Sequence, residues 1–399
     1  MDTMSKIKPR LLEDKLLDNA NGSVFDHLGV TPVINCCGVY TDFGGSRLSP
    51  TVWAAMAEMN LDYAQLPAMF EATGARIASL LGAEAALITP GASAAIMLGT
   101  AACMAGLDGD ISARLPDVTG IKHEVLIQTG QRYKFDRQVT MPGAKLIEVG
   151  SENGTSVDQI EDAIGPKTAM FIYAAHLEGK PGTLSLDDVV AVCKTHNVPV
   201  FVDAAYMCYP ISKLSEYNER GADLVTMSSK YFSGPNAGGF IMGKKKLIDA
   251  VVNVYFTRYE SGEVLKYGRP MKMDRQIIAA VVLALEEWLE TDHDKRLQEH
   301  VDHANALKES IKDIPGLTLD PMYFTLDERL VPDPVNSLVV GFEPGCKLGV
   351  DYLEEKLAQG NPIISAVRKG EKLVFALDVV TADEVVFVGK RINEIAEAV

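Results

Sequence analysis

The sequence lacks the features that mark secreted, membrane-spanning or zinc-binding proteins. Its six cysteines form neither a CxxC pair nor the paired spacing of a zinc site. The N-terminus has neither the apolar core nor the small-residue cleavage site of a signal peptide. The longest nearly apolar stretch, Ala94 to Leu107, is shorter than the about 20 residues that span a bilayer. These absences predict a cytoplasmic protein with reduced thiols, no membrane association and no metal site.

Positive charge is also scarce. Lys and Arg total 38 against 54 for Asp and Glu, which gives a formal net charge of −16. Such a charge repels nucleic-acid phosphates and anionic membranes, so neither is an expected partner. The nucleotide-binding pattern GxxxxGK[ST] is missing as well. An anionic small molecule therefore needs a local positive pocket.

From about residue 84, short apolar runs alternate with helical patterns. The runs are 85–88, 125–127, 145–149, 170–173, 200–202, 224–227 and 239–242. The helical patterns between and before them are 49–60, 68–81, 93–105, 156–163, 186–196 and 211–219. This alternation predicts an α/β fold with a mostly parallel seven-stranded sheet covered by helices on both faces.

The last third of the chain predicts a second domain. A long amphipathic stretch, about 273–312, is expected to be one linker helix, and its histidines at 293, 300 and 303 are interpreted as solvated. The remainder, about 313–399, predicts a small α+β unit with a final helix from Ala382. We therefore expect an N-terminal arm (1–45), a large domain (46–272), and a linker helix with a small C-terminal domain (273–399).

Two polar residues follow apolar runs of the predicted sheet. Asp203 ends one run, and Lys230 lies just after another. Ligands of open α/β sheets gather at the carboxyl ends of strands, so these residues could share one ligand. Pyridoxal 5'-phosphate (PLP) needs such a pair, because a carboxylate keeps the ring nitrogen protonated while a lysine forms the Schiff base. Taken alone, Asp203 could equally cap a helix, and Lys230 could be a surface lysine.

Two glycine-containing segments favour the cofactor interpretation. The segment 89–95, TPGASAA, follows one run and opens a helix of small residues, so that backbone N–H groups and a hydroxyl could bind an anion. The segment 231–239, YFSGPNAGG, follows Lys230, and its glycines permit close backbone approach to a ligand or subunit. Each segment could also be an ordinary turn. Their order along the chain, however, is phosphate cup, Asp strand, Lys strand and glycine loop.

With these motifs the chain resembles fold-type I PLP-dependent enzymes of the SelA-like group. That group contains selenocysteine synthase-like and D-glucosaminate-6-phosphate ammonia-lyase-like proteins. The matching segments are PVIN (32–35), GVYT (38–41), GGS (44–46), TGAR (73–76), LGAEAAL (81–87), VDAA (202–205) and GRPMK (268–272). The resemblance implies PLP as cofactor and a homodimer or higher homo-oligomer.

The resemblance also implies roles for individual residues. Lys230 would carry the Schiff base, Asp203 would bind the ring nitrogen, and Ala205 would pack on the ring. The residues that would bind the phosphate are Gly91, Ala92, Ser93 and Ser228, with Gly234 in the glycine loop near the cofactor. Gln131 and Arg132 stand where the group has a His-Arg pair facing the ring. A glutamine cannot stack or exchange protons as imidazole does, so the ring-stacking residue stays open.

Several further residues could bind an acidic substrate. These candidates are Arg47, His176, Arg269, Lys272 and Arg368, and Glu178 lies near His176 in the sequence. A dimer-interface or surface role is an equal alternative for the arginines, and a structural role is the alternative for His176.

The expected reaction is that of a PLP-dependent lyase. It would act at Cα and Cβ of an amino acid or amino sugar acid, eliminate a β-hydroxyl and release ammonia to give a 2-oxo acid. A racemase, aldolase or transferase would use the same scaffold. A non-catalytic PLP-fold binding subunit is the non-enzyme alternative, although the presence of both Asp203 and Lys230 argues against it. The negative charge argues against tRNA binding, and hence against a selenocysteine synthase.

Overall fold

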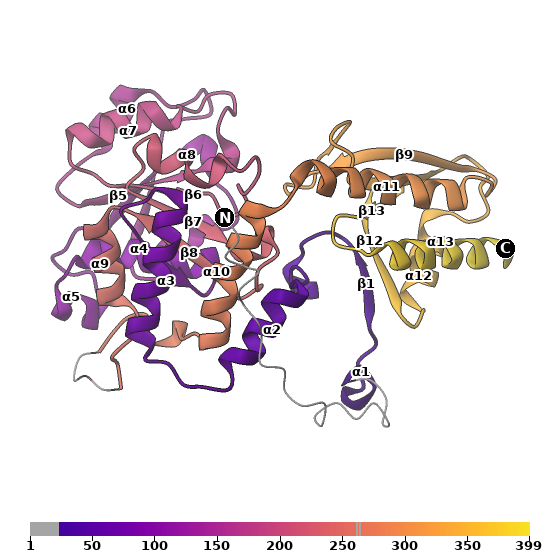
Figure 1. Cartoon of the computed structure of the whole chain (residues 1–399). Helices are drawn as coiled ribbons and strands as arrows, with labels where there is room; N and C mark the ends of the chain where they lie inside the picture. Colours follow the sequence, from indigo (N-terminus) through magenta and orange to yellow (C-terminus); the bar gives the residue numbers. More distant parts are fainter. Residues whose placement is uncertain (1–23, 261, 263–264) are drawn as a thin grey trace. The chain divides into compact units, whose positions relative to one another are not determined.

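The computed structural model describes residues 24–399 except 261, 263 and 264. This part of the chain forms two compact units, each with its own buried core (Figure 1). The large unit contains Leu48–Leu289, and the small unit joins the described residues up to Arg47 to Glu290–Val399. Among the described residues, no helix is long and apolar enough to cross a membrane.

The large unit is built on a seven-stranded sheet with the order β2-β8-β7-β6-β5-β3-β4. Its strands are β2 (Ala85–Thr89), β3 (Glu124–Gln128), β4 (Lys145–Val149), β5 (Thr168–Ala174), β6 (Val200–Asp203), β7 (Leu224–Ser228) and β8 (Gly239–Gly243). Only β8 is antiparallel to its neighbours, β2 and β7. The prediction of seven strands in a mostly parallel sheet is confirmed. Because β2 and β7 both oppose β8, six strands end at one edge, which we call the carboxyl edge.

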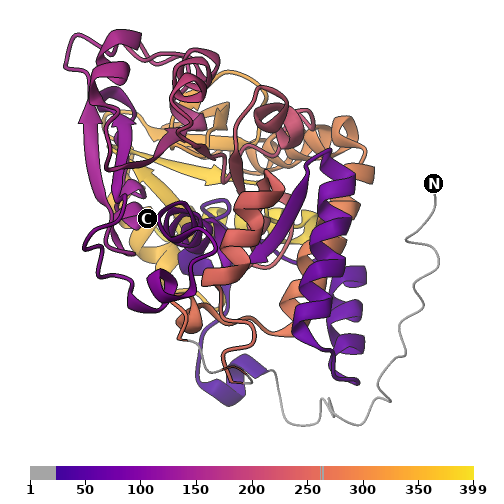
Figure 2. The same ribbon diagram turned by 90° about the vertical axis from the view of Figure 1, so that its left-hand side faces the viewer.

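Helices cover both faces of this sheet, which explains why its central strands are apolar throughout. The helices of the large unit are α2 (Pro50–Met59), α3 (Leu66–Leu81), α4 (Gly91–Ala105), α5 (Gly109–Arg114), α6 (Val157–Ala163), α7 (Leu186–Thr195), α8 (Lys213–Glu219), α9 (Lys245–Val254) and α10 (Arg275–Glu290). α4 packs on β5, β6, β7 and β8, and α9 packs beside α4 on β2 and β8. Right-handed crossovers place α6, α7 and α8 on the opposite face (Figures 1 and 2).

The predicted linker helix is two helices, so the expectation of one continuous helix is wrong. α10 ends at Glu290, and α11 (His293–Ile311) starts after Asp292, whose side chain accepts a hydrogen bond from the Lys295 backbone N–H (3.0 Å). A side chain that caps a new helix N-terminus favours such a break. α10 belongs to the large unit, where the Trp288 indole N–H donates to the Cys208 carbonyl oxygen (2.9 Å). The compact units therefore divide after Leu289, not after residue 272.

The small unit contains a six-stranded sheet with the order β1-β12-β13-β11-β9-β10. Its strands are β1 (Val33–Cys36), β9 (Leu317–Phe324), β10 (Leu330–Val331), β11 (Ser337–Phe342), β12 (Ile363–Lys369) and β13 (Lys372–Ala376). Its helices are α1 (Val24–Leu28), α11, α12 (Val350–Ala358) and α13 (Ala382–Glu397). α13 begins at the expected residue. The sequence did not predict that β1, from the N-terminal arm, pairs in parallel with β12.

One histidine of α11 is not solvated as expected. His300 is 8% exposed and lies on the buried face of the helix with Ala304, Leu307 and Ile311. Burial, followed by the charge of Arg296, lowers the pKa of His300 to about 4. His300 is therefore part of the packing of the small unit, and the interpretation of this side chain as solvated is wrong.

Candidate active site

Asp203 and Lys230 emerge from neighbouring strands at the carboxyl edge. Asp203 is the last residue of β6 and is in register with Thr226 of β7. Lys230 lies in the 3-10 helix Ser229–Phe232 that directly follows β7. The Ser228 backbone N–H donates to the Ala205 carbonyl oxygen (2.9 Å), so the two segments stay side by side beyond the strands. The predicted pair is therefore on one edge of one sheet.

Asp203 is a buried carboxylate held by two donors. It is 5% exposed; Oδ1 accepts from the Ala205 backbone N–H (3.1 Å), and Oδ2 accepts from the Tyr133 hydroxyl (2.5 Å). Burial raises the pKa of Asp203, while the Tyr133 and Ala205 hydrogen bonds and the nearby His176 lower it. Each oxygen retains a lone pair. The carboxylate can thus accept a hydrogen bond from a cationic ring nitrogen.

Aromatic rings connect Asp203 to the lysine segment. Tyr133 lies edge-on to His176 with ring centroids 5.1 Å apart, and His176 lies 5.5 Å from Tyr206. Tyr206 in turn lies 5.8 Å from Tyr231, and Lys230 Nζ lies 4.9 Å from the Tyr231 ring centroid. We call Tyr133, His176, Tyr206 and Tyr231 the aromatic band. These rings give the carboxyl edge flat, partly apolar surfaces next to a carboxylate and an amine.

The predicted phosphate cup lies at the start of α4. Gly91, Ala92 and Ser93 are its first three residues, and Gly91 has φ +84°, which favours glycine. The Thr89 hydroxyl donates to the Gly91 carbonyl oxygen (3.1 Å) and fixes this turn. Backbone N–H groups in the first turn of a helix have no partner within the helix, so this end of α4 suits an anion.

β8 joins the cup to the lysine strand. Gly239 is paired with Thr89 of β2 on one side and with Ser228 of β7 on the other. A Cβ on Gly239 would lie 2.5 Å from the Met227 carbonyl oxygen and 3.1 Å from Gly91 Cα. Only glycine at position 239 therefore lets the cup approach the Ser228 segment so closely. At this separation, Ser228 and the cup could bind the same anion.

The glycine loop closes around the residue that precedes Lys230. The Gly234 backbone N–H donates to the Ser229 carbonyl oxygen (2.8 Å), and the Ser229 hydroxyl donates to the Pro235 carbonyl oxygen (2.5 Å). Ser229 also receives support from Gly238, whose carbonyl accepts the Ser229 backbone N–H (3.0 Å). These bonds position the turn that carries Lys230.

The loop after β3 carries the two residues that were expected to face the ring. Gln131 is fully buried, and its side-chain oxygen accepts from the Ala174 backbone N–H (3.4 Å) at the end of β5. Arg132 is paired with Asp136 (2.5 Å) and with Glu148. Neither side chain approaches Asp203 through a hydrogen bond. Tyr133, the next residue, makes that contact, and sequence reasoning did not single it out.

The two candidates after β5 separate into different roles. His176 belongs to the aromatic band and lies close enough to lower the pKa of Asp203. Glu178 instead binds Arg220 with both oxygens (2.6 and 3.0 Å) and accepts from the Leu186 backbone N–H (3.2 Å). Glu178 is therefore committed to holding the start of α7.

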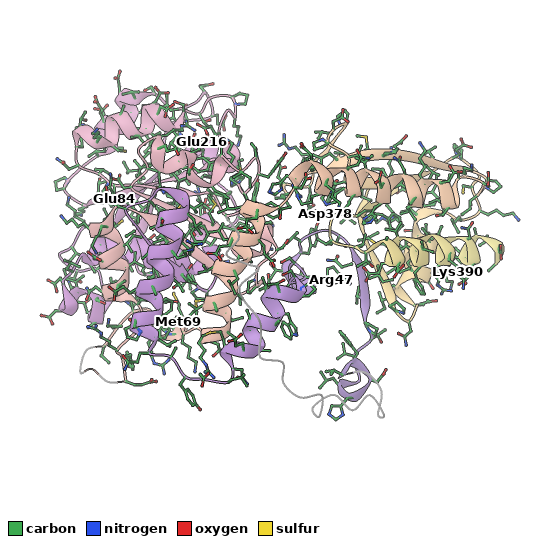
Figure 3. The ribbon with its side chains drawn as sticks, viewed as in Figure 1. Arg47, Met69, Glu84, Glu216, Asp378 and Lys390 are labelled. Carbon is green, nitrogen blue, oxygen red and sulfur yellow. The ribbon has the colours of Figure 1, made fainter. Side chains whose placement is uncertain are left out.

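The four cationic substrate candidates lie in two different units. Arg269 is in the large unit, paired with Glu260 (2.6 Å) and stacked 5.2 Å from the Tyr259 ring centroid, and Lys272 is exposed nearby. The small unit holds Arg47 (Figure 3), which is paired with Glu384 (2.6 Å). It also holds Arg368, which is paired with Asp351 (2.5 Å) and Glu354 (3.0 Å). Within the described part of the large unit, neither Arg269 nor Lys272 is hydrogen-bonded to the Asp203 segment.

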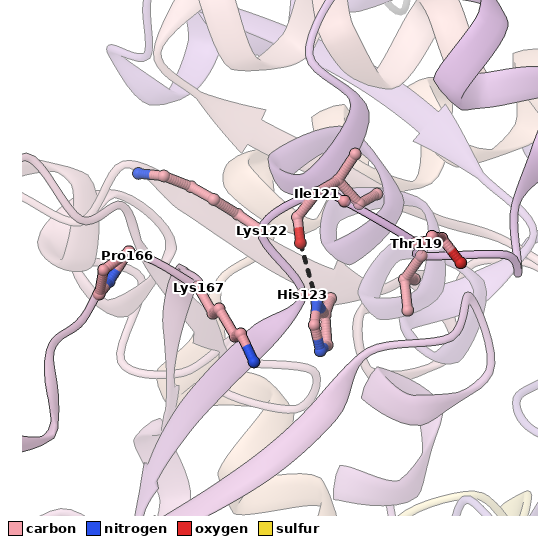
Figure 4. A pocket seen from close by; sticks show the side chains of 8 residues that line it. Thr119, Ile121, Lys122, His123, Pro166 and Lys167 are labelled. Carbon is pink, nitrogen blue, oxygen red and sulfur yellow. Dashed lines mark hydrogen bonds between the residues drawn. The ribbon is translucent and has the colours of Figure 1, made fainter.

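A pocket of about 500 Å³ lies elsewhere on the large unit (Figure 4). Its lining residues are Val118–His123, Pro166 and Lys167, and the His123 ring nitrogen Nδ1 lies 2.8 Å from the Ile121 carbonyl oxygen. These residues precede β3 and β5, so the pocket is at the amino ends of those strands. It is on the opposite edge of the sheet from Asp203 and Lys230 and is not part of the candidate site.

Comparisons with known proteins identify the fold and the class. A solved structure of D-glucosaminate-6-phosphate ammonia-lyase matches with a TM-score of 0.81 and 28% identity, covering 95% of this chain and 99% of that one. D-Glucosaminate-6-phosphate ammonia lyase from Salmonella typhimurium is 30% identical over 387 residues, which cover 94% of this chain and 98% of that protein. 5'-C-Glycyluridine monooxygenase-decarboxylase from Streptomyces is 30% identical over 305 residues, which cover 74% and 72%.

Fold and site together define a fold-type I PLP-dependent enzyme, as the resemblance implied. The family model of SelA, L-seryl-tRNA selenium transferase, matches residues 50–314. The chain belongs to the SelA family, and PLP is its cofactor. The residues present fit this group, because a buried carboxylate, a lysine and a helix N-terminus that can receive an anion all lie on the carboxyl edge.

Proposed function

We propose that this chain is an ammonia-lyase acting on a 2-amino acid with a β-hydroxyl, and that the substrate is an amino sugar acid such as D-glucosaminate 6-phosphate. The observation that carries the proposal is similarity along 94% of the chain to an ammonia lyase of that specificity, combined with Asp203 and Lys230 on neighbouring strands. Net, the substrate would lose its β-hydroxyl as water, regain water when the resulting C=N bond hydrolyses, and yield ammonia and a 2-oxo acid.

The geometry of the carboxyl edge supports the proposed cofactor-binding residues. Asp203 would bind the ring nitrogen, and the first turn of α4 with Ser228 would bind the phosphate. β2 and β6 are separated by β8 and β7, so the two binding ends are three strand spacings, or about 14 Å, apart. An extended ligand with a cationic ring at one end and an anionic group at the other suits this span. Ala205, next to Asp203, would pack on the ring.

Lys230 is the proposed catalytic base. When bound, PLP supplies a ring that withdraws electrons from Cα of an attached amino acid. Lys230 would bind PLP covalently in the resting enzyme and, once freed, take the proton from the substrate Cα at Nζ. Its Nζ lies over the Tyr231 ring, which limits the directions in which the amine can move. We propose that His176 donates a proton to the departing β-hydroxyl.

Substrate recognition is proposed to use the cationic residues named above. Arg269 and Lys272 lie in the large unit, and Arg47 and Arg368 would have to exchange their carboxylate partners for a substrate carboxylate or phosphate. We also propose a homodimer or higher oligomer in the cytoplasm. All six cysteines are free, and four of them are buried, which fits a reducing compartment.

The test is product formation by the PLP-loaded enzyme. Amino sugar acids, with and without a terminal phosphate, and 2-amino-3-hydroxy acids are supplied, and ammonia and 2-oxo acid are measured in equal amounts. Lys230→Ala should abolish both products and the visible absorbance band of the lysine-bound cofactor. Lys244→Ala is the matched control, because Lys244 follows β8 at the other edge of the sheet and pairs with Glu84 (2.8 Å). Absence of ammonia and 2-oxo acid with every substrate contradicts the proposal.

Decarboxylation is the second candidate. The similarity to the Streptomyces monooxygenase-decarboxylase over 74% of the chain favours it. Release of carbon dioxide from a carboxyl-labelled amino acid, without stoichiometric 2-oxo acid, would select this reaction over the lyase.

A further inference from the structure

We propose that Tyr133 is a positioning residue that holds the Asp203 carboxylate ready for the PLP ring nitrogen. The inference rests on the PLP-dependent function of the chain. It concerns binding of the cofactor and needs no particular reaction.

The contact itself is direct and shielded. Tyr133 is half-buried, and its hydroxyl donates to Asp203 Oδ2 at 2.5 Å, which is the short range of hydrogen bonds to a charged acceptor. A second donor on Asp203 is the Ala205 backbone N–H, on Oδ1. Each oxygen thus accepts a hydrogen bond, which fixes the plane of the carboxylate that is to receive a ring N–H.

Charge explains why a buried carboxylate needs this hydroxyl. Burial favours the neutral form of Asp203, whose pKa it raises, and only the ionised form can stabilise a protonated ring nitrogen. The Tyr133 hydrogen bond is the largest of the effects that lower the pKa of Asp203. The other titratable groups that act on this site are His176, which lowers the same pKa, and Tyr231.

The chain holds Tyr133 in place from its other side. Asp136 is 4% exposed, and its Oδ2 accepts from the Tyr133 backbone N–H (3.1 Å) and from Arg132 Nε (2.5 Å). Arg132 is paired with Asp136 and Glu148, and Gln131 points at the Ala174 backbone. The loop therefore uses residues 131 and 132 to anchor itself and presents residue 133 to the site.

The test compares two ligands that differ at one atom. Dissociation constants are measured by absorbance titration for PLP and for its deaza analogue, in which a C–H replaces the ring nitrogen. For Tyr133→Phe, which removes only the hydroxyl, we expect PLP binding to weaken about 10- to 100-fold, the range for losing a hydrogen bond to a charged group. The dissociation constant of the analogue should stay nearly unchanged, because the analogue has no ring N–H that could donate a hydrogen bond to Asp203.

Two further variants separate positioning from packing. Tyr217→Phe removes a buried hydroxyl that has no hydrogen-bond partner among the described residues, and it should leave both constants unchanged. In an Asp203→Asn background, Tyr133→Phe should change the dissociation constants of PLP and of the analogue by the same factor. The negative charge of Asp203, which the Tyr133 hydroxyl stabilises, is absent there.

Equal weakening of both ligands by Tyr133→Phe would overturn the proposal, since the hydroxyl would then act only through the fold. Unchanged PLP binding would overturn it too. If the wild-type chain binds no PLP, the cofactor assignment falls together with this role. Failure of the lyase assay, by contrast, leaves the binding result standing, so the two proposals are separately refutable.

Discussion

Gly239→Ala offers the sharpest test of how the phosphate cup and the lysine strand are held together. The new Cβ would lie 2.5 Å from the Met227 carbonyl oxygen and 3.1 Å from Gly91 Cα, both of which are backbone atoms. One of the two segments must shift, and overpacking of this kind costs about 1–3 kcal/mol of folding free energy. If Gly91 shifts, the first backbone N–H groups of α4 no longer point at the cofactor phosphate. The loss of one charge-assisted hydrogen bond would weaken PLP binding about 10- to 100-fold.

A matched control exists at the other end of the same strand. A Cβ on Gly243 would lie 2.1 Å from the Asp223 carbonyl oxygen, and Gly243 has φ +147°, so Gly243→Ala is at least as strained. Its site is remote from the cup. Thermal unfolding should show a lower Tm for both variants, whereas titration should show weaker PLP binding for Gly239→Ala alone. Equal PLP affinities in the two variants would refute the argument that Gly239 sets the geometry of the cup.

Two more predictions concern charge. Burial lowers the pKa of His300 from 6.5 to about 4. Between these values the unfolded chain binds a proton that the folded chain does not, so the free energy of unfolding falls as the pH falls from 6.5 toward 4. The loss is about 2 kcal/mol at pH 5. His300→Gln should therefore flatten the change in urea unfolding free energy between pH 8 and pH 5, whereas the exposed His196→Gln should not; equal slopes in wild type and His300→Gln contradict this. Ser228→Ala should weaken PLP about tenfold but not pyridoxal, which has no phosphate; equal losses for both ligands would exclude a phosphate contact.

Much of the fold was predictable because its signals are local. Uninterrupted apolar runs between helical patterns specify buried parallel strands, and all seven of them are strands of the sheet. The positions of Asp203 and Lys230 at the carboxyl edge were predictable for the same reason, since each follows such a run within a few residues. The pairing of β1 with β12 was not predictable in this way, because it joins segments about 330 residues apart and depends on the small unit as a whole.

Other features depend on geometry that the sequence pattern does not carry. Gln131 and Arg132 were expected at the ring because of their position relative to a family motif, whereas their partners, the Ala174 backbone N–H for Gln131 and two carboxylates for Arg132, depend on tertiary contacts. One sequence signal could have drawn attention to Tyr133. Asp136 follows it by three residues, and a carboxylate at that spacing can accept a hydrogen bond from the tyrosine backbone N–H. The helix break at Asp292 also had a signal, because an aspartate before a charged helical run is a common N-cap. The amphipathic pattern continues on both sides of Asp292, so the pattern alone predicts one continuous helix.

The electrostatics of the site resolve the apparent conflict between an anionic cofactor and a chain of net charge −16. In the proposed site the anionic end of the ligand would meet the start of α4, whose dipole and unpaired N–H groups are positive without any added charged residue. The cationic end would meet Asp203, whose charge is costly to bury and is compensated in part by Tyr133 and Ala205. A protonated ring nitrogen would complete that compensation. Binding should therefore favour the protonated ring over the neutral one, and the deaza analogue, which lacks the proton, should bind the wild-type chain more weakly than PLP.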